Sequence, residues 1–108
     1  MAFVRKKHAT YDWPVTVEVP TDGGKFDKQV FNATFKQLGR SDFAKLADQG
    51  DIQLLEAVVV GWNGIQDEKG KELEFNLPEL RDLADDPYWC RGVVKAYLES
   101  LEGAQSKN

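Results

Sequence analysis

The strictest constraint on the fold is the alternation of apolar and mostly polar residues in Trp13-Pro14-Val15-Thr16-Val17-Glu18-Val19. Successive side chains of a β-strand point to opposite faces, so the four odd-numbered residues would share one buried face. The segment Thr21-Asp22-Gly23-Gly24-Lys25 follows, and glycine reaches positive φ at little cost. This stretch therefore predicts a strand that ends in a tight turn.

A second strand is predicted after the turn, over residues 28–38. Phe31, Ala33 and Phe35 fall on one face of it, and mostly polar residues alternate with them. The two strands would form an antiparallel hairpin. Because a lone hairpin is at best marginally stable in water, its apolar face needs a cover from the rest of the chain.

The remainder of the chain is predicted to be mainly helical. A short helix is expected around residues 42–48. A second helix begins at Asp51 and ends at Gly61, because the apolar residues at positions 52, 55, 59 and 62 recur at helical spacing. An acidic glycine turn at residues 67–70 follows. Asn76, with an acid three residues later, is typical of the start of a helix of about two turns.

A final helix is predicted from Asp86-Pro87 to about Glu102, with Gly103 as its stop. An apolar stripe runs along this helix, and three further apolar residues widen it. The stripe consists of Cys90, Val94, Tyr97, Leu98 and Leu101, and Trp89, Val93 and Ala96 widen it. So wide a stripe indicates two packed sides, one against the hairpin and the other against another chain.

The expected fold class is α+β, with an N-terminal antiparallel β-hairpin packed against a mostly helical C-terminal two-thirds. The chain of 108 residues fits a single domain, residues 1–108. We expect an ordered core over about residues 10–102 and a polar, disordered tail over residues 103–108. A domain of this size buries only about two-thirds of the surface that its unfolded chain exposes, which favours association with another copy or a partner.

Charge and cysteine content narrow the range of partners. Residues 55–108 carry 11 acidic and 6 basic residues, a net charge of −5. Such a half repels phosphate, so nucleic acid is not an expected partner.

No stretch approaches the ~20 apolar residues of a membrane span, and no secretory signal is recognisable, so no membrane association is expected. The single cysteine, Cys90, excludes an intramolecular disulfide and fits a reducing cytoplasm.

The sequence contains no recognisable catalytic or metal-binding pattern. The one histidine, His8, lies in a charged segment away from any framed Ser or Cys, and Cys90 lies on the apolar stripe of a helix. One histidine and one cysteine provide no ligand spacing for a metal. The acidic cluster over residues 67–74 lacks the glycine that an EF-hand needs at its sixth position. We therefore expect no enzyme, no cofactor and no metal site.

Three aromatic residues are candidate partner-binding residues: Tyr88, Trp89 and Trp62. Neighbouring helical residues point about 100° apart, so one of Tyr88 and Trp89 would stay exposed while the other packs inward. Trp and Tyr are frequent anchors of protein interfaces. Gly61 and Gly64 flank Trp62 and are expected to form a sharp structural corner. We expect Trp62 to anchor this corner on the final helix first, and to contact a partner only second.

Several short motifs follow one another in a distinctive order between residues 40 and 102. They are Val60-Gly61-Trp62-Asn63-Gly64-Ile65, Asp67-Glu68-Lys69-Gly70, Leu73-Glu74-Phe75, Asn76 to Leu80, Asp86-Pro87-Tyr88 and Lys95-Ala96-Tyr97-Leu98. This order resembles the tail assembly chaperones of long-tailed bacteriophages and prophages. The N-terminal hairpin fits that family more loosely.

The resemblance implies a protein-binding function. In that family the small protein binds the tape-measure protein and keeps it soluble until tail-tube subunits polymerise around it. A longer form, made by ribosomal frameshifting, often adds an extension that binds the tail tube, and the present chain resembles the short form. The resemblance also implies a location in the host bacterial cytoplasm and absence from the mature virion. Self-association into a homo-oligomer would place several weak grooves along one long client.

Two other classes of function fit the sequence. An acidic inhibitor or immunity-type module would block a basic enzyme, and residues 67–86 hold 8 acidic against 3 basic residues. It predicts tight one-to-one binding with strong salt sensitivity, whereas a chaperone predicts multivalent apolar binding with weak salt sensitivity. A structural component of the virion tail predicts retention in purified particles.

Overall fold

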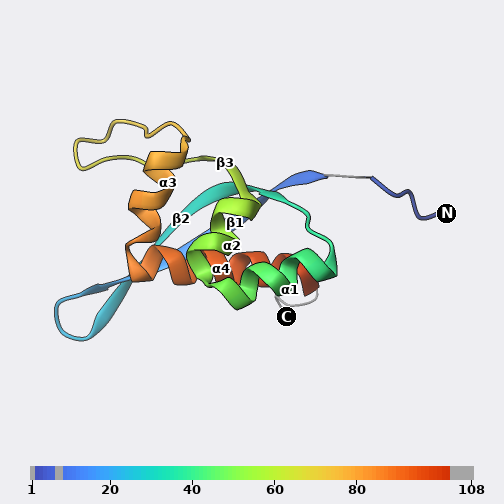
Figure 1. The fold of residues 1–108 in the computed structure, drawn as a ribbon. Coiled ribbons are helices and arrows are strands. Elements are labelled where there is room, and N and C mark those ends of the chain that lie inside the picture. The colour runs from blue at the N-terminus through green and yellow to red at the C-terminus, as the bar shows by residue number, and fades with distance from the viewer. Residues whose placement is uncertain (1, 7–8, 103–108) are drawn as a thin grey trace.

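The structure, a computed structural model, describes residues 2–6 and 9–102. Strands β1 (Thr10–Thr21) and β2 (Lys25–Lys36) form the predicted antiparallel hairpin (Figure 1). Gly23 and Gly24 occupy its turn with φ angles of 82° and 77°, which explains why glycine is needed there. The predicted α+β class, with this hairpin packed against helices, is confirmed. The predicted tail at residues 103–108, and Gly103 as a helix stop, lie outside the described residues.

A third strand lies where the sequence analysis extends a helix. Helix α2 (Asp51–Val58) ends early, and the chain continues as β3 (Val59–Asn63), which pairs antiparallel with β2. The prediction that the helix runs to Gly61, with Trp62 on its apolar face, is therefore wrong. Consecutive β-branched residues, Val58 to Val60, are stiff at χ1 and fit a pleated strand better than a helix.

The helices lie against one face of the three-stranded sheet, whose order is β1-β2-β3 (Figure 1). Helix α4 (Pro87–Glu102) packs along β1, and α2 packs against β2 and β3. Helices α1 (Arg40–Gln49) and α3 (Leu77–Ala84) pack against α2. This arrangement gives the hairpin the apolar cover that it requires.

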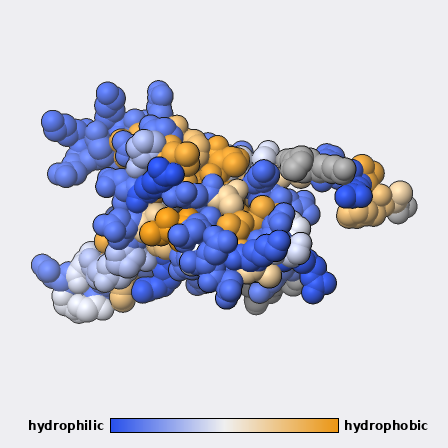
Figure 2. All heavy atoms as spheres, viewed as in Figure 1, coloured by the Kyte–Doolittle hydropathy of each residue, from blue (hydrophilic) through white to orange (hydrophobic). Residues whose placement is uncertain are grey.

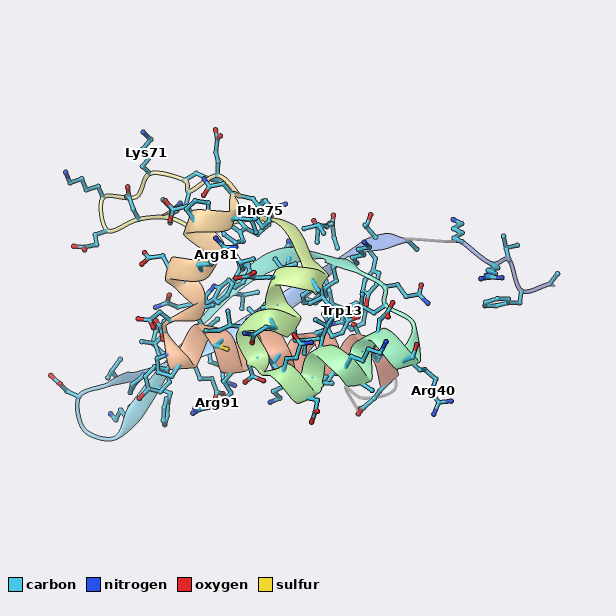
Figure 3. All side chains as sticks on the ribbon, viewed as in Figure 1. Trp13, Arg40, Lys71, Phe75, Arg81 and Arg91 are labelled. Carbon is cyan, nitrogen blue, oxygen red and sulfur yellow. The ribbon has the colours of Figure 1, made fainter. Side chains whose placement is uncertain are left out.

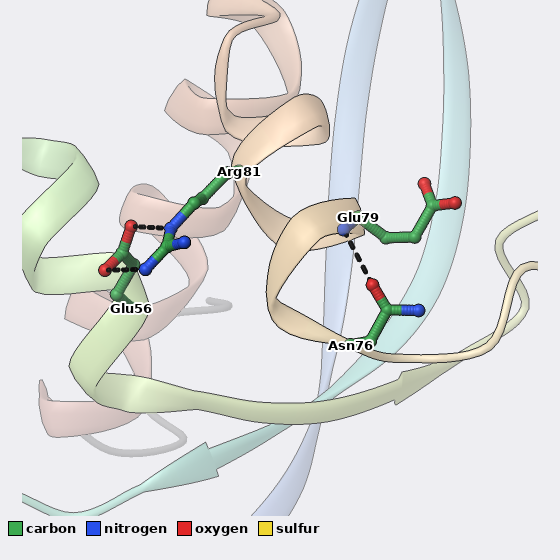
Figure 4. A network of polar contacts seen from close by, with 4 residues as sticks. All are labelled: Glu56, Asn76, Glu79 and Arg81. Atoms are coloured by element: carbon green, nitrogen blue, oxygen red, sulfur yellow. Dashed lines mark hydrogen bonds and ion pairs between the residues drawn. The ribbon is translucent and has the colours of Figure 1, made fainter.

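Two of the predicted helix starts are confirmed by hydrogen bonds. The Asn76 side chain accepts a hydrogen bond from the Glu79 backbone N–H at 2.9 Å and so caps α3 (Figure 4). The Asp86 carboxylate accepts one from the Tyr88 backbone N–H at 2.8 Å before α4, whose first residue is Pro87. These contacts fix where the chain enters the two helices that follow the acidic loop.

The core lies between the sheet and the helices. It contains the predicted face of β2 and the centre of the predicted face of β1, whereas Trp13 and Val19 at the ends of that face are only half-buried. Its buried residues are Val15, Val17, Phe31, Ala33 and Phe35 from the hairpin, Leu54, Leu55 and Val58 from α2, Val59, Trp62 and Ile65 around β3, Leu80 and Ala84 from α3, and Trp89, Val93, Ala96 and Tyr97 from α4. Gly92 lets α4 approach β1 closely, because a Cβ at Gly92 would lie 2.7 Å from the Thr16 carbonyl oxygen. The hairpin side of the apolar stripe is thus packed.

Candidate functional site

Trp62 is a buried residue of β3 that connects three parts of the molecule. Its indole N–H donates a hydrogen bond to the Leu73 carbonyl at 2.9 Å, and its ring meets Phe75 edge-on at a centroid distance of 4.9 Å. It also meets Trp89 of α4 edge-on at 6.1 Å. Trp62 therefore contacts the final helix, as expected of a structural anchor, and it offers little surface to a partner.

Of the neighbouring pair in α4, Trp89 packs inward and Tyr88 is half-buried. The Trp89 ring stacks on Phe31 at a centroid distance of 5.9 Å with the planes 3° apart. Its buried indole N–H has no hydrogen-bond partner among the described residues. The Arg91 guanidinium lies 5.6 Å from the centroid of the Tyr88 ring. Of the two, Tyr88 is thus the more accessible to a partner, and partner binding by any of the three aromatics stays a prediction.

The predicted glycine corner is formed by one glycine and not by two. Gly64 has a φ of 89°, and its backbone N–H donates to the Glu72 carboxylate at 3.3 Å. Gly61 lies within β3 beside Thr34 and has no positive φ, so its assignment to the corner is wrong. The chain bends at Gly64 because only there does the backbone enter the left-handed region.

The acidic turn after Gly64 is a closed loop stabilised by hydrogen bonds between its own residues. Asp67 accepts hydrogen bonds at one carboxylate oxygen from the backbone N–H groups of Lys69 and Lys71, at 2.8 and 3.0 Å. The Gly70 N–H donates to the Asp67 carbonyl at 3.0 Å, as in the predicted turn. Lys71 points outward from this loop, and Phe75 lies where the loop meets α3 (Figure 3). The Asp67 carboxylate thus has a structural role.

We expect Trp62→Phe to reduce the free energy of unfolding by about 1 kcal/mol more than Trp89→Phe does. The first substitution removes the hydrogen bond to Leu73 that holds the loop. The second removes a buried donor without a described partner, and the relief of its desolvation penalty offsets part of the lost packing. Urea unfolding of both variants measures the difference. A larger loss for Trp89→Phe would contradict this description of its indole N–H.

An open apolar groove runs along the side of α4 that faces away from the sheet, and we call it the α2–α4 groove. Its cavity volume is about 770 Å³. The apolar and sulfur-containing residues that line it are Ile52, Ala84, Pro87, Cys90, Val94 and Leu98. Ile52 and Leu98 are 44% and 40% exposed. In Figure 2 hydrophobic side chains reach the surface over α2 and α4, among hydrophilic ones.

Charged residues also line this groove, and acids outnumber bases. Four negative charges come from Asp51, Asp85, Glu99 and Glu102, and two positive charges come from Arg91 and Lys95. The lining therefore has a net charge of −2. Arg91 projects outward from α4 (Figure 3). Burial raises the pKa of the Cys90 thiol, and the nearby negative charge of Asp51 adds to the effect. The thiol is therefore protonated at neutral pH and is a poor nucleophile.

An ion pair connects the two shorter helices that border the groove. The Arg81 guanidinium of α3 donates to the Glu56 carboxylate of α2 at 2.8 Å (Figure 4). The hydrogen bond from Arg81 lowers the pKa of Glu56. A lowered pKa contributes stability above the unfolded-state pKa, and that stability is lost as the pH falls through the folded-state value. Because both side chains are partly exposed, the contribution is small.

The sequence predicts this groove only in part. The wide apolar stripe on the final helix predicted a second packed side, and Cys90, Val94 and Leu98 lie on that side. Ile52 comes from another helix, and no local pattern connects it with them. The described residues include no group of three or more His, Cys, Asp or Glu arranged to hold a metal ion. No helix in the described part of the chain has the length and hydropathy to cross a membrane.

A comparison of the chain with protein-family models, curated proteins and solved structures finds no match.

Proposed function

We propose that this chain is a tail assembly chaperone of the short form, which binds a tape-measure protein and keeps it soluble during tail assembly. The observation that carries the proposal is the α2–α4 groove, an exposed apolar surface bordered by charge. The order of motifs from Val60 to Leu98, which resembles this family, supports it independently. The protein would act in the host bacterial cytoplasm and leave before the virion is complete.

The groove has the properties that reversible binding of an aggregation-prone client requires. Exposed apolar side chains such as Ile52 and Leu98 give up contact with water when a client covers them. The shallow, open groove favours weak binding, and several copies along one client would raise the total affinity by avidity. The net charge of −4 keeps such an assembly soluble by mutual repulsion. A longer frameshifted form would add contact with the tail-tube protein.

Co-expression with a tape-measure protein, which the proposal expects to be encoded in a neighbouring gene, tests the proposal. We expect the chain to raise the soluble fraction of the client several-fold and to co-purify with it in several copies. Leu98→Asp places a charge on the apolar lining of the groove and should abolish most of this effect, because an ion buried under a client is strongly disfavoured. Leu98 is already partly exposed, so the substitution should leave the fold intact.

Val30→Asp is the matched control. Val30 is an exposed apolar residue of β2 outside the groove, so its substitution should leave client solubility unchanged. A client that stays insoluble with the unmodified chain would reject the proposal. Tight, salt-sensitive, one-to-one binding to a basic enzyme would instead support the inhibitor, and retention in purified particles would support a structural component of the tail.

A further inference from the structure

Residues 2–6, which we call the arm, leave an apolar pair in water. Phe3 and Val4 are 92% and 70% exposed, and the arm belongs to no helix or strand. The arm lines a hollow together with residues at the β2–α1 junction, but this placement does not bury Phe3. Arg5 and Lys6 follow, both exposed. Exposed apolar residues next to charge are typical of surfaces that bind a partner.

The arm and the α2–α4 groove are complementary in polarity and in charge. The arm presents two apolar side chains followed by two positive charges and contains no acid, for a net charge of +2. The groove presents an apolar lining with a net charge of −2. Opposite potentials on two surfaces favour encounter and fix orientation. One chain therefore carries both halves of a matching pair, and neither half is covered in the single copy.

We propose that, in the client-free protein, the arm of a second copy occupies the α2–α4 groove. Phe3 and Val4 cover the apolar lining around Ile52 and Leu98, while Arg5 and Lys6 face the acids Asp51 and Glu99. The occupant is a second copy because the arm runs away from its own α2 and α3 (Figure 1). An arm of five residues makes a small interface, so the association is weak and transient.

This contact joins two different surfaces, so each pair of copies keeps one free arm and one free groove. Such head-to-tail contacts extend into rings or open chains, in contrast to the closed pair that a symmetric contact makes. Under the proposed function, on which this consequence rests, a client segment enters the groove by displacing the arm. Copies without a client would then keep their apolar groove covered.

Sedimentation velocity of the full chain over a concentration series tests the self-association, and it requires no client. We expect the average mass of the unmodified chain to rise with concentration. An arm variant, Phe3→Ser with Val4→Ser, and a groove variant, Leu98→Asp, should each associate at least about tenfold more weakly. Phe26→Ser is the matched control, because Phe26 is exposed on the hairpin and outside the α2–α4 groove, so it should associate as the unmodified chain does.

Mixing the two variants gives the sharpest test. The arm variant retains a groove and the groove variant retains an arm, so the mixture should form one-to-one pairs that do not extend, and it should do so at concentrations at which each variant alone is monomeric. Cys90, the only cysteine, lines the groove and reports its occupancy. Because this thiol is protonated at neutral pH, its alkylation by iodoacetamide is slow and is best followed at mildly alkaline pH. The alkylation should slow further as the concentration of the unmodified chain rises, and should be independent of concentration in the arm variant.

An unmodified chain that stays monomeric at every concentration, or a mixture that forms no pairs, would overturn the inference. So would an arm variant that associates as strongly as the unmodified chain. None of these results would contradict the proposed chaperone function, because client solubility is measured separately. Conversely, concentration-dependent pairing through the arm would stand even if the tape-measure protein stayed insoluble.

Discussion

We expect Gly92→Ala to lower the free energy of unfolding by about 2–3 kcal/mol. The added Cβ would lie 2.7 Å from the Thr16 carbonyl oxygen and 3.3 Å from the Val17 Cα. Both are backbone atoms of β1, a strand paired with β2 along its whole length, so neither can rotate away as a side chain could. Helix α4 must instead shift off the strand and loosen the packing of its neighbours Trp89, Val93 and Ala96. Urea unfolding measures the loss.

Helix propensity and the close approach to β1 predict opposite signs for the effect of Gly92→Ala. Glycine inside a helix is ordinarily less favourable than alanine by about 1 kcal/mol, so helix propensity alone predicts that Gly92→Ala stabilises the protein. Lys95→Ala, at an exposed position of the same helix, is the control and should change stability by less than about 0.5 kcal/mol. A stabilised Gly92→Ala protein would show that α4 does not approach β1 closely. It would thereby contradict the position of α4 on which the α2–α4 groove depends.

Features set by neighbouring residues could be predicted from the sequence. The hairpin follows from the alternation around Val15 and Val17 and from two glycines in its turn, and both signals lie within a few residues. The caps at Asn76 and Asp86 likewise depend on a side chain and a backbone N–H at most three residues apart. Such contacts depend only on local chain geometry, so no knowledge of the tertiary fold is needed.

Features set by distant residues could not be predicted. The segment around Val59 and Trp62 matches helical spacing, but its pairing with β2 provides hydrogen bonds to residues almost thirty positions away in the sequence. This non-local pairing outweighs the local pattern. From the sequence alone, Gly92 is an unfavourable residue within a helix. Only the fold shows that it lies against Thr16, which is remote in sequence. The close approach explains a residue that helix propensity alone disfavours.

The candidate site likewise has features that the sequence predicts and features that only the tertiary packing sets. The width of the stripe on α4 follows from the sequence and predicts two packed sides; the side against the hairpin is confirmed, and the side against another chain stays a prediction. Which of Tyr88 and Trp89 packs inward depends on how α4 rotates about its axis. Packing sets that rotation, and it turns Trp89 onto Phe31. Ile52 joins Leu98 in the groove only because α2 lies beside α4. Size and aromatic character thus identify anchors of the core more reliably than anchors of an interface.

We expect Tyr97→Ala to have the largest effect of any substitution considered, a loss of about 3–5 kcal/mol in the free energy of unfolding. Tyr97 is fully buried, and its ring meets Phe35 of β2 edge-on at 5.1 Å and lies 6.2 Å from Phe43 of α1. It therefore connects α4, the sheet and α1. Since small domains have total stabilities of about 5–15 kcal/mol, the variant should be partly unfolded at 37 °C. Thermal and urea unfolding both measure this.

Tyr97→Phe separates the ring from the hydroxyl group and adds a dependence on pH. The variant keeps the ring contacts and loses one long hydrogen bond to the Lys36 carbonyl, 3.3 Å, so near neutral pH it should lose only about 1 kcal/mol. Burial raises the pKa of Tyr97, with a smaller effect from Tyr11, so folding favours the neutral phenol. The resulting stability is complete below the unfolded-state pKa of about 10 and is lost as the pH rises through the folded-state value. Above pH ~10 the unmodified chain should therefore lose stability faster than Tyr97→Phe, and parallel pH profiles would contradict the burial of this hydroxyl group.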